Sequence, residues 1–155
     1  MENKERFKVI PEVFLFIEKD EQILLSRRFN TGWEDGNYGL VAGHGESGET
    51  AREGTAREAL EEAGIVVDPE ALEYKLTQYR FARDKDNHHA RVGFYFKANS
   101  WQGEIKNMEP NKCDDLGFFP IDDLPKNTVD HVREAIRCYK NGVNYSEFNW
   151  EEKND

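Results

Sequence analysis

Three glutamates, Glu58, Glu61 and Glu62, stand within about one turn of each other in a segment with helical spacing. The helix is predicted over residues 50–63, and Gly64 suits the left-handed position that ends many helices. At 100° per residue the three carboxylates project from one side of it. Like charges at this spacing repel each other by a few tenths of a kcal/mol, and a divalent cation would convert that repulsion into coordination.

A solvated helix face is the other interpretation of these glutamates, because exposed helix faces are commonly charged. The helix offers few partners for such a face, since Arg52 and Arg57 are the only bases between Glu49 and Gly64. The opposite side of the helix is apolar and is expected to pack on a sheet: Ala56, Ala59, Leu60 and Ala63.

The charge and composition exclude several classes of protein. The 155 residues include 21 Lys and Arg against 31 Asp and Glu, a net charge of −10, which disfavours nucleic-acid binding through a basic surface. Cys113 and Cys138 lack the spacing of a zinc cage, and the longest apolar run, 13–17, is too short to span a membrane. The chain length is typical of one domain, so we expect a single domain over residues 1–155. Since no secretory signal is visible at the N-terminus, we expect the protein in the cytoplasm.

The order of the elements indicates an α+β fold with a mixed β-sheet. Runs of β-branched and aromatic residues alternate with turn residues, and residues 84–87 have the composition of a hairpin turn. The expected strands cover 8–18, 22–28, 38–42, 73–82, 91–98 and 116–120, the helices cover 50–63 and 129–140, and the tail over 145–155 is expected to dock weakly or fray.

The loop before the first helix extends this pattern into a known motif. Residues 43–65 resemble the Nudix box, which is a Gly, five residues, a Glu, seven residues, Arg-Glu, an apolar residue, any residue, Glu-Glu, any residue, Gly and an apolar residue. The matching positions are Gly43, Glu49, Arg57, Glu58, Glu61, Glu62 and Gly64, with Ala59 and Ile65 in the apolar places. The resemblance implies the Nudix α/β/α sandwich, with the mixed sheet between helices.

The same resemblance implies an activity and a cofactor. Nudix pyrophosphohydrolases cleave a nucleoside diphosphate linked to another group and use Mg²⁺ or Mn²⁺. Carried onto this chain, Glu61 and Glu62 are metal ligands, Glu58 is a ligand or the base that positions water, and the carbonyl of Ala42 is a further ligand. Water would attack one phosphorus of the pyrophosphate while the metal neutralises its oxygens.

Further candidates complete the expected site. Arg57 and Glu49 would pair and hold the loop against the helix. An additional acidic metal ligand is expected from a loop after the hairpin, with Glu109 the first choice and Asp114 the second, and a solvated loop charge as the other interpretation. Substrate contacts are expected from four side chains, for which surface or core roles are the alternatives: Arg27, Arg28, Arg80 and Tyr79.

The substrate is less well defined by the sequence. Arg80 stands where ADP-ribose hydrolases of the family carry a proline, and the Ser-Gln-Pro-Trp-Pro-Phe signature of NADH-type members is missing. We therefore expect a small nucleoside triphosphate, including oxidised ones such as 8-oxo-dGTP, and a monomer or homodimer without a membrane or nucleic-acid partner. The alternative is a nucleotide-sensing module that does not cleave its ligand, and the complete glutamate set favours the enzyme.

Overall fold

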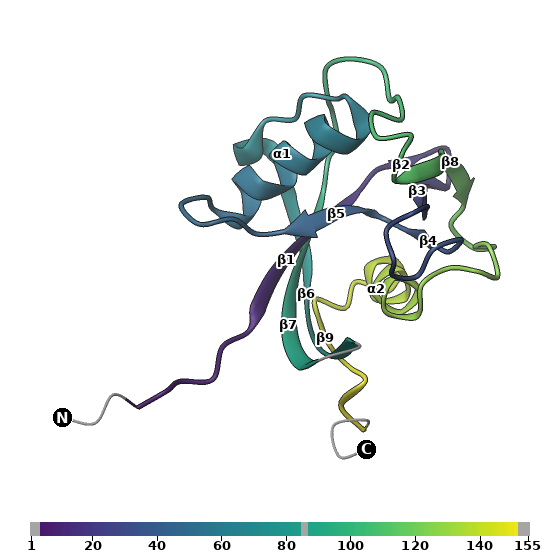
Figure 1. Ribbon diagram of the computed structural model, residues 1–155. Coiled ribbons are helices and arrows are strands. Elements are labelled where there is room, and N and C mark those ends of the chain that lie inside the picture. The colour runs from purple at the N-terminus through teal and green to yellow at the C-terminus, as the bar shows by residue number, and fades with distance from the viewer. Residues whose placement is uncertain (1–3, 85–86, 152–155) are drawn as a thin grey trace.

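The computed structural model describes residues 4–84 and 87–151 of the chain (Figure 1). The elements in chain order are β1 (Ile10–Phe16), β2 (Glu18–Lys19), β3 (Gln22–Arg28), β4 (Tyr38–Gly39), β5 (Val41–His44), α1 (Ala51–Ala63), the 3-10 helix η1 (Pro69–Ala71), β6 (Glu73–Asp84), β7 (Asn87–Lys97), β8 (Cys113–Pro120), α2 (Asp130–Lys140) and β9 (Tyr145–Phe148). No helix in this part of the chain is long and apolar enough to cross a membrane.

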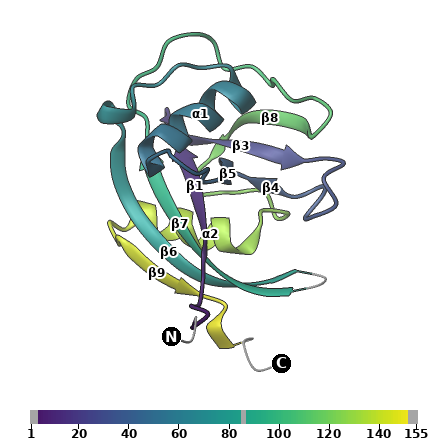
Figure 2. The ribbon, with the colours of Figure 1, turned by 60° about the vertical axis from the view of Figure 1, so that its left-hand side comes forward.

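Two sheets form the framework (Figure 2). The larger has the order β5-β1-β7-β6-β9 and is mixed, since β1 runs parallel to β7 and β9 runs parallel to β6. The smaller sheet contains β2, β3 and β4, with β8 antiparallel on β3. The expected hairpin is confirmed as the antiparallel pair β6 and β7, although two residues of its turn, 85 and 86, lie outside the described residues.

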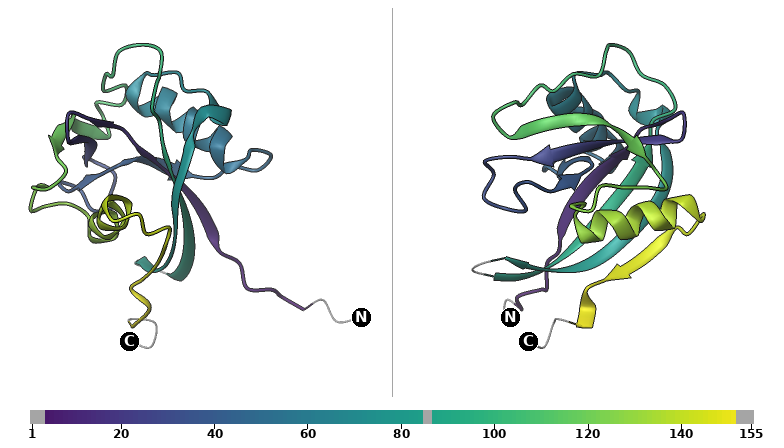
Figure 3. Two further views of the ribbon diagram at one scale, coloured as in Figure 1. Left: turned by 180° about the vertical axis from the view of Figure 1, so that it is seen from behind. Right: turned by 90° about the vertical axis from the view of Figure 1, so that its right-hand side faces the viewer.

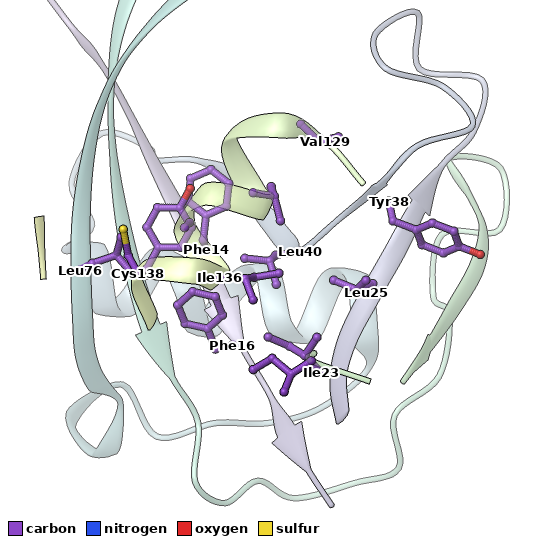
Figure 4. Packing of buried hydrophobic residues seen from close by; sticks show 14 residues of the cluster. Phe14, Phe16, Ile23, Leu25, Tyr38, Leu40, Leu76, Val129, Ile136 and Cys138 are labelled. Atoms are coloured by element: carbon purple, nitrogen blue, oxygen red, sulfur yellow. The ribbon is translucent and has the colours of Figure 1, made fainter. Parts of the chain in front are cut away.

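One helix covers each face of the larger sheet (Figures 1 and 3). Successive side chains of a strand point to opposite faces, and β1 shows this alternation clearly. Phe14 and Phe16 pack in the cluster that includes Ile136 of α2 (Figure 4), whereas Leu15 and Ile17 pack in the cluster on the α1 side. The layers confirm the α+β fold with a mixed sheet between helices.

The helix expected over 50–63 is confirmed as α1, and it ends at Gly64 as expected, with Thr50 as its N-terminal cap. The Thr50 hydroxyl accepts a hydrogen bond from the backbone N–H of Glu53, and Gly64 ends the helix at φ 69°. The prediction that Leu60 packs on the sheet is wrong, because its side chain is 53% exposed. Ala59 and Ala63 make the buried contact instead, since their small side chains let the helix approach the strands closely.

The expectation that the C-terminal tail docks only weakly or frays is also wrong over most of its described part. Residues of β9 pair with β6, which otherwise would be an edge strand with unpaired backbone groups. Ser146 is buried, and the indole Nε1 of Trp150 donates a hydrogen bond to the carbonyl of Tyr79 at 2.9 Å. Residues 152–155 lie outside the described part of the chain.

We predict that Gly93→Ala destabilises the protein by about 1–3 kcal/mol, because a Cβ there would overpack the core. That Cβ would lie 2.9 Å from the ring of Phe14 and 3.1 Å from the ring of Tyr95, whose centroids stack 4.2 Å apart. Gly39→Ala is the control, since its Cβ would meet nothing within 4 Å. Urea unfolding measures both, and equal free energies of unfolding in the two variants would contradict the prediction.

Candidate active site

Arg57 fastens the glycine-rich loop to α1. Its Nε and Nη2 donate to the two carboxylate oxygens of Glu49 at 3.0 and 2.9 Å, and Nη2 also donates to the carbonyl of His44. Glu49 in turn accepts the backbone N–H of Glu46, so one carboxylate holds both the arginine and the loop. The expected Arg57–Glu49 pair is thus confirmed, and the guanidinium lowers the pKa of Glu49.

Two of the three helix glutamates turn toward the edge of the larger sheet. Glu62 Oε2 accepts a hydrogen bond from the backbone N–H of Ala42 at 3.1 Å. Because the N–H and C=O of a strand residue point to the same side, the Ala42 carbonyl faces that edge as well. A Cβ on Gly43 would lie 2.0 Å from Oε1 of Glu58, so a residue without a side chain is required for Glu58 to occupy its place.

Burial and neighbouring carboxylates raise the pKa of two of these glutamates. Burial raises the pKa of Glu58, Arg57 opposes this, and the charges of Glu61 and Glu109 add to the rise. Burial likewise raises the pKa of Glu62 well above its usual value, with Glu58 and Glu109 contributing. Several negative groups therefore share a poorly solvated space, which is unfavourable until a positive charge joins them.

A positively charged side chain already lies among these groups. Nη1 of Arg57 donates to Glu58 Oε1 at 2.7 Å and to Glu61 Oε2 at 3.2 Å. Within residues 4–84 and 87–151 no three acidic, His or Cys side chains form a closed metal cluster, and Glu61 stays about half exposed. The donor set nevertheless fits a divalent cation, since it consists of hard carboxylate oxygens whose mutual repulsion a metal would relieve.

The loop before β8 brings a further carboxylate to the site. Glu109 lines the same cleft as the helix glutamates, whereas Asp114, the second choice, does not line it and forms an ion pair with Arg27 at 2.6 Å. The loop is fixed by its own bonds, because Asn107 accepts the N–H of Glu109 and donates to the carbonyl of Cys113. The N–H of Met108 donates to the carbonyl of Glu62, which ties this loop to the end of α1.

The carboxylates line a cleft of about 660 Å³ on the α2 face of the larger sheet. Arg28 and Arg80 line it, as expected for substrate contacts. The expectation for Arg27 and Tyr79 is not met, because neither lines the cleft: Arg27 pairs with Asp114, and Tyr79 packs its ring against Trp150. Each is adjacent in sequence to a lining arginine, and strand alternation sends neighbouring side chains to opposite faces.

The lining residues that sequence reasoning missed include Glu12, Arg91, Lys112 and His131. Glu12 carried a usable signal, since it is a lone carboxylate at the start of an otherwise apolar strand. Lys112 follows Glu109 in a loop whose shape comes from hydrogen bonds that the sequence does not reveal. Arg91 and His131 come to the cleft only through strand register and the packing of α2.

The fold and the carboxylate-lined cleft define a hydrolase of the class anticipated from the box. A family model described as the NUDIX domain matches residues 9–138, so the chain belongs to the Nudix family. It is a Nudix pyrophosphohydrolase, in a family whose members act on nucleoside diphosphate derivatives.

Individual relatives agree with this assignment. The chain is 33% identical to the ADP-ribose pyrophosphatase of Methanocaldococcus jannaschii, over 81% of this chain and 72% of that protein. It is also 33% identical to the NAD-capped RNA hydrolase NudC of Pseudomonas entomophila, over 76% of this chain but only 39% of that longer protein. The solved MutT NUDIX hydrolase from Burkholderia pseudomallei has a TM-score of 0.74 and 27% identity, over 84% of this chain and 97% of that one.

We predict that Glu62→Gln lowers kcat by about two orders of magnitude or more, since it removes a charged oxygen donor from the centre of the site. In the metal-free protein the same change leaves the thermal midpoint unchanged or raises it, because a buried charge that faces Glu58 and Glu109 disappears. Glu53→Gln, in the exposed first turn of α1, is the control that should keep normal turnover. Turnover assays and thermal unfolding in a chelator test both statements, and near-normal kcat in Glu62→Gln would refute the assignment.

Proposed function

We propose that this protein hydrolyses the pyrophosphate bond of a nucleoside diphosphate linked to another group, with a divalent cation as cofactor. The observation that supports this most directly is the convergence of Glu58 and Glu62 on the strand edge at Ala42, inside the cleft. A chain with net charge −10 would otherwise repel a polyphosphate, and a bound cation removes that difficulty.

The proposed ligands of Mg²⁺ or Mn²⁺ are the carboxylates of Glu58, Glu61, Glu62 and Glu109 and the carbonyl oxygen of Ala42. When bound, the ion would neutralise the non-bridging phosphate oxygens and lower the pKa of a coordinated water. Arg57 and Glu49 hold the loop and the helix in one arrangement. The proposed metal ligands are therefore already in position before each turnover.

Glu58 is our candidate for the group that orients the attacking water and accepts its proton. Burial raises the pKa of this carboxyl, which makes it a better proton acceptor, and the hydrogen bond from Arg57 fixes its orientation. Arg28 and Lys112 line the same cleft and supply positive charge for the phosphate oxygens. The water oxygen ends on the attacked phosphorus, and the other phosphate leaves with the bridging oxygen.

Two substrate classes follow from different observations. The sequence favours small nucleoside triphosphates, including oxidised ones, because Arg80 replaces the proline expected of ADP-ribose hydrolases. ADP-ribose is the second class, since the relative from Methanocaldococcus jannaschii is an ADP-ribose pyrophosphatase. The cleft of about 660 Å³ is in the size range of small-molecule sites, so it suits either class.

We predict that removal of divalent ions by EDTA reduces turnover to below about 1% and that added Mg²⁺ or Mn²⁺ restores it. A panel of nucleoside triphosphates and ADP-ribose, with phosphate and pyrophosphate release measured separately, identifies the substrate and the bond that breaks. Full turnover in EDTA would contradict the proposed cofactor. Tight binding of a nucleotide without any cleavage would instead favour a sensing module.

A further inference from the structure

The cleft has an apolar part beside α2. Four of its lining residues belong to the hydrophobic cluster on the α2 face of the larger sheet (Figure 4): Phe14, Leu40, Val129 and Val132. The carboxylates that line the cleft come from α1 and from the loop before β8, apart from Glu12 of β1. The phosphate chain of a nucleotide suits the acidic part once a cation is bound, and its base suits the apolar part.

Trp33 presents an aromatic ring at this apolar part of the cleft. It lies in the loop between β3 and β4, lines the cleft and is 38% exposed. Its ring is nearly parallel to the imidazole of His131 in α2, with an interplanar angle of 24° and the ring centroids 6.2 Å apart. The indole therefore lies beside the amino end of α2 and still has surface on which a further ring can stack.

The loop that carries Trp33 is held in one conformation by hydrogen bonds. Asp35 accepts the backbone N–H groups of Thr31 and Gly32 at 3.0 and 2.8 Å, and it also accepts the Thr31 hydroxyl. Arg28 donates from Nε to the carbonyl of Trp33 at 2.7 Å, and its guanidinium carbon lies 4.8 Å from the centre of the indole. Because the indole is positioned in advance, stacking of a ligand on it costs little conformational entropy.

His131 supplies a buried polar atom that lacks a partner. The residue is 6% exposed, and its Nδ1 has no hydrogen-bond partner within the described residues. Phe14 contacts the imidazole edge-on, with the ring centroids 5.8 Å apart, so the plane of the ring is fixed by Phe14 and Trp33. Native structures rarely leave a buried polar atom unpaired, because its desolvation is not compensated. Since His131 lines the cleft, a ligand can supply the missing partner.

The charge state of His131 indicates the kind of ligand. Burial lowers the pKa of its imidazole well below the usual value, so the ring is neutral at pH 7. A neutral imidazole has one nitrogen that donates a hydrogen bond and one that accepts. A heterocyclic base carries both donors and acceptors along its edge, whereas a phosphate mainly accepts and is better bound by a cation. His131 therefore suits the base of a nucleotide better than its phosphates.

We propose that Trp33 and His131 bind the nucleobase of the substrate, with the base stacked on the indole and hydrogen-bonded to Nδ1 of the imidazole. The inference rests on the proposed function and orients its substrate, with the phosphates toward α1 and the base toward α2. Because the two rings are nearly parallel, a base stacked on Trp33 is also nearly parallel to the imidazole, whose hydrogen-bonding groups lie in its ring plane. Stacking tolerates any base, so His131 is the residue that distinguishes one base from another.

Binding to the turnover-impaired Glu62→Gln protein tests Trp33 without requiring catalysis. Calorimetry compares inorganic pyrophosphate with ADP, GDP, CDP and UDP at constant Mg²⁺, and we expect at least one nucleotide to bind about tenfold more tightly than pyrophosphate. Trp33→Leu should lower the affinity for each nucleotide about tenfold and leave that for pyrophosphate unchanged, whereas Trp33→Phe keeps an aromatic ring and most of the affinity. Phe29→Leu is the matched control, since Phe29 is a 46% exposed aromatic residue of the same loop that does not line the cleft.

His131→Phe in the same background tests the second residue, because it keeps a ring and removes both ring nitrogens. We expect the difference in affinity between the tightest and the weakest of the four nucleotides to shrink to about twofold or less, with the affinity for pyrophosphate unchanged. A merely structural role would instead shift all affinities together. Equal affinities for the four nucleotides before this substitution would overturn the role of His131.

Tryptophan fluorescence reports contact with the base directly. A base that stacks on Trp33 changes the emission of its indole, so the tightest nucleotide should change the fluorescence of the Glu62→Gln protein and do so much less after Trp33→Phe, although both proteins bind it. The other two tryptophans, Trp101 and Trp150, do not line the cleft. This comparison tests the stacking even if Trp33→Leu does not fold, which thermal midpoints report.

The inference is overturned if no nucleotide binds more tightly than pyrophosphate, if folded Trp33→Leu keeps the full preference, or if the change in fluorescence persists in Trp33→Phe. These results are distinguishable from failure of the proposed function. If the wild-type protein hydrolyses nucleotides and shows none of these effects, only the base site is wrong. If the effects are present and no nucleotide is hydrolysed, the base site stands and the proposed hydrolysis is wrong.

Discussion

The inward-facing carboxylates of α1 are the constraint on which the rest of this structure depends. Glu58 and Glu62 are one helical turn apart, burial raises the pKa of both, and the charge of Glu58 raises the pKa of Glu62 further. Such an arrangement opposes folding unless neighbouring groups hold it. Arg57 contacts Glu58, and the backbone of Ala42 donates to Glu62, so the site is stabilised before any metal or substrate binds.

The fold gathers several cations in the cleft that also holds this negative charge. Overall the chain carries −10, yet Arg28, Arg80, Arg91 and Lys112 all line one cleft. They come from β3, from the β6–β7 hairpin and from the loop before β8, three segments that are distant in the sequence and meet only in the folded protein. The net charge of the chain therefore predicts the potential around the molecule better than it predicts the local potential in the cleft.

Local sequence patterns predicted the positions of most helices and strands well. They predicted less well which side chains of each element are buried. The left-handed Gly64 that ends α1 is a short-range feature, and it has the expected geometry. The burial of Leu60 was predicted wrongly because α1 does not bury its whole apolar side. It buries Ala59 and Ala63 from that side and Glu58 from the carboxylate side, which borders a polar cleft, and this leaves Leu60 exposed. The docking of the tail was also predicted wrongly, because β9 is stabilised by pairing with β6, some 70 residues earlier, and local patterns do not reveal such a contact.

By itself the sequence determined the family, the two helices, the hairpin, the Arg57–Glu49 pair and the carboxylates proposed as metal ligands, because all of these follow from short-range spacing. Only the tertiary structure decided which of the candidates beyond the box reach the cleft. Arg80 enters it and Tyr79 does not, and Glu12 meets two arginines from other strands. The physical reason is that strand register and helix packing, set by contacts between distant segments, fix the direction in which each of these side chains points.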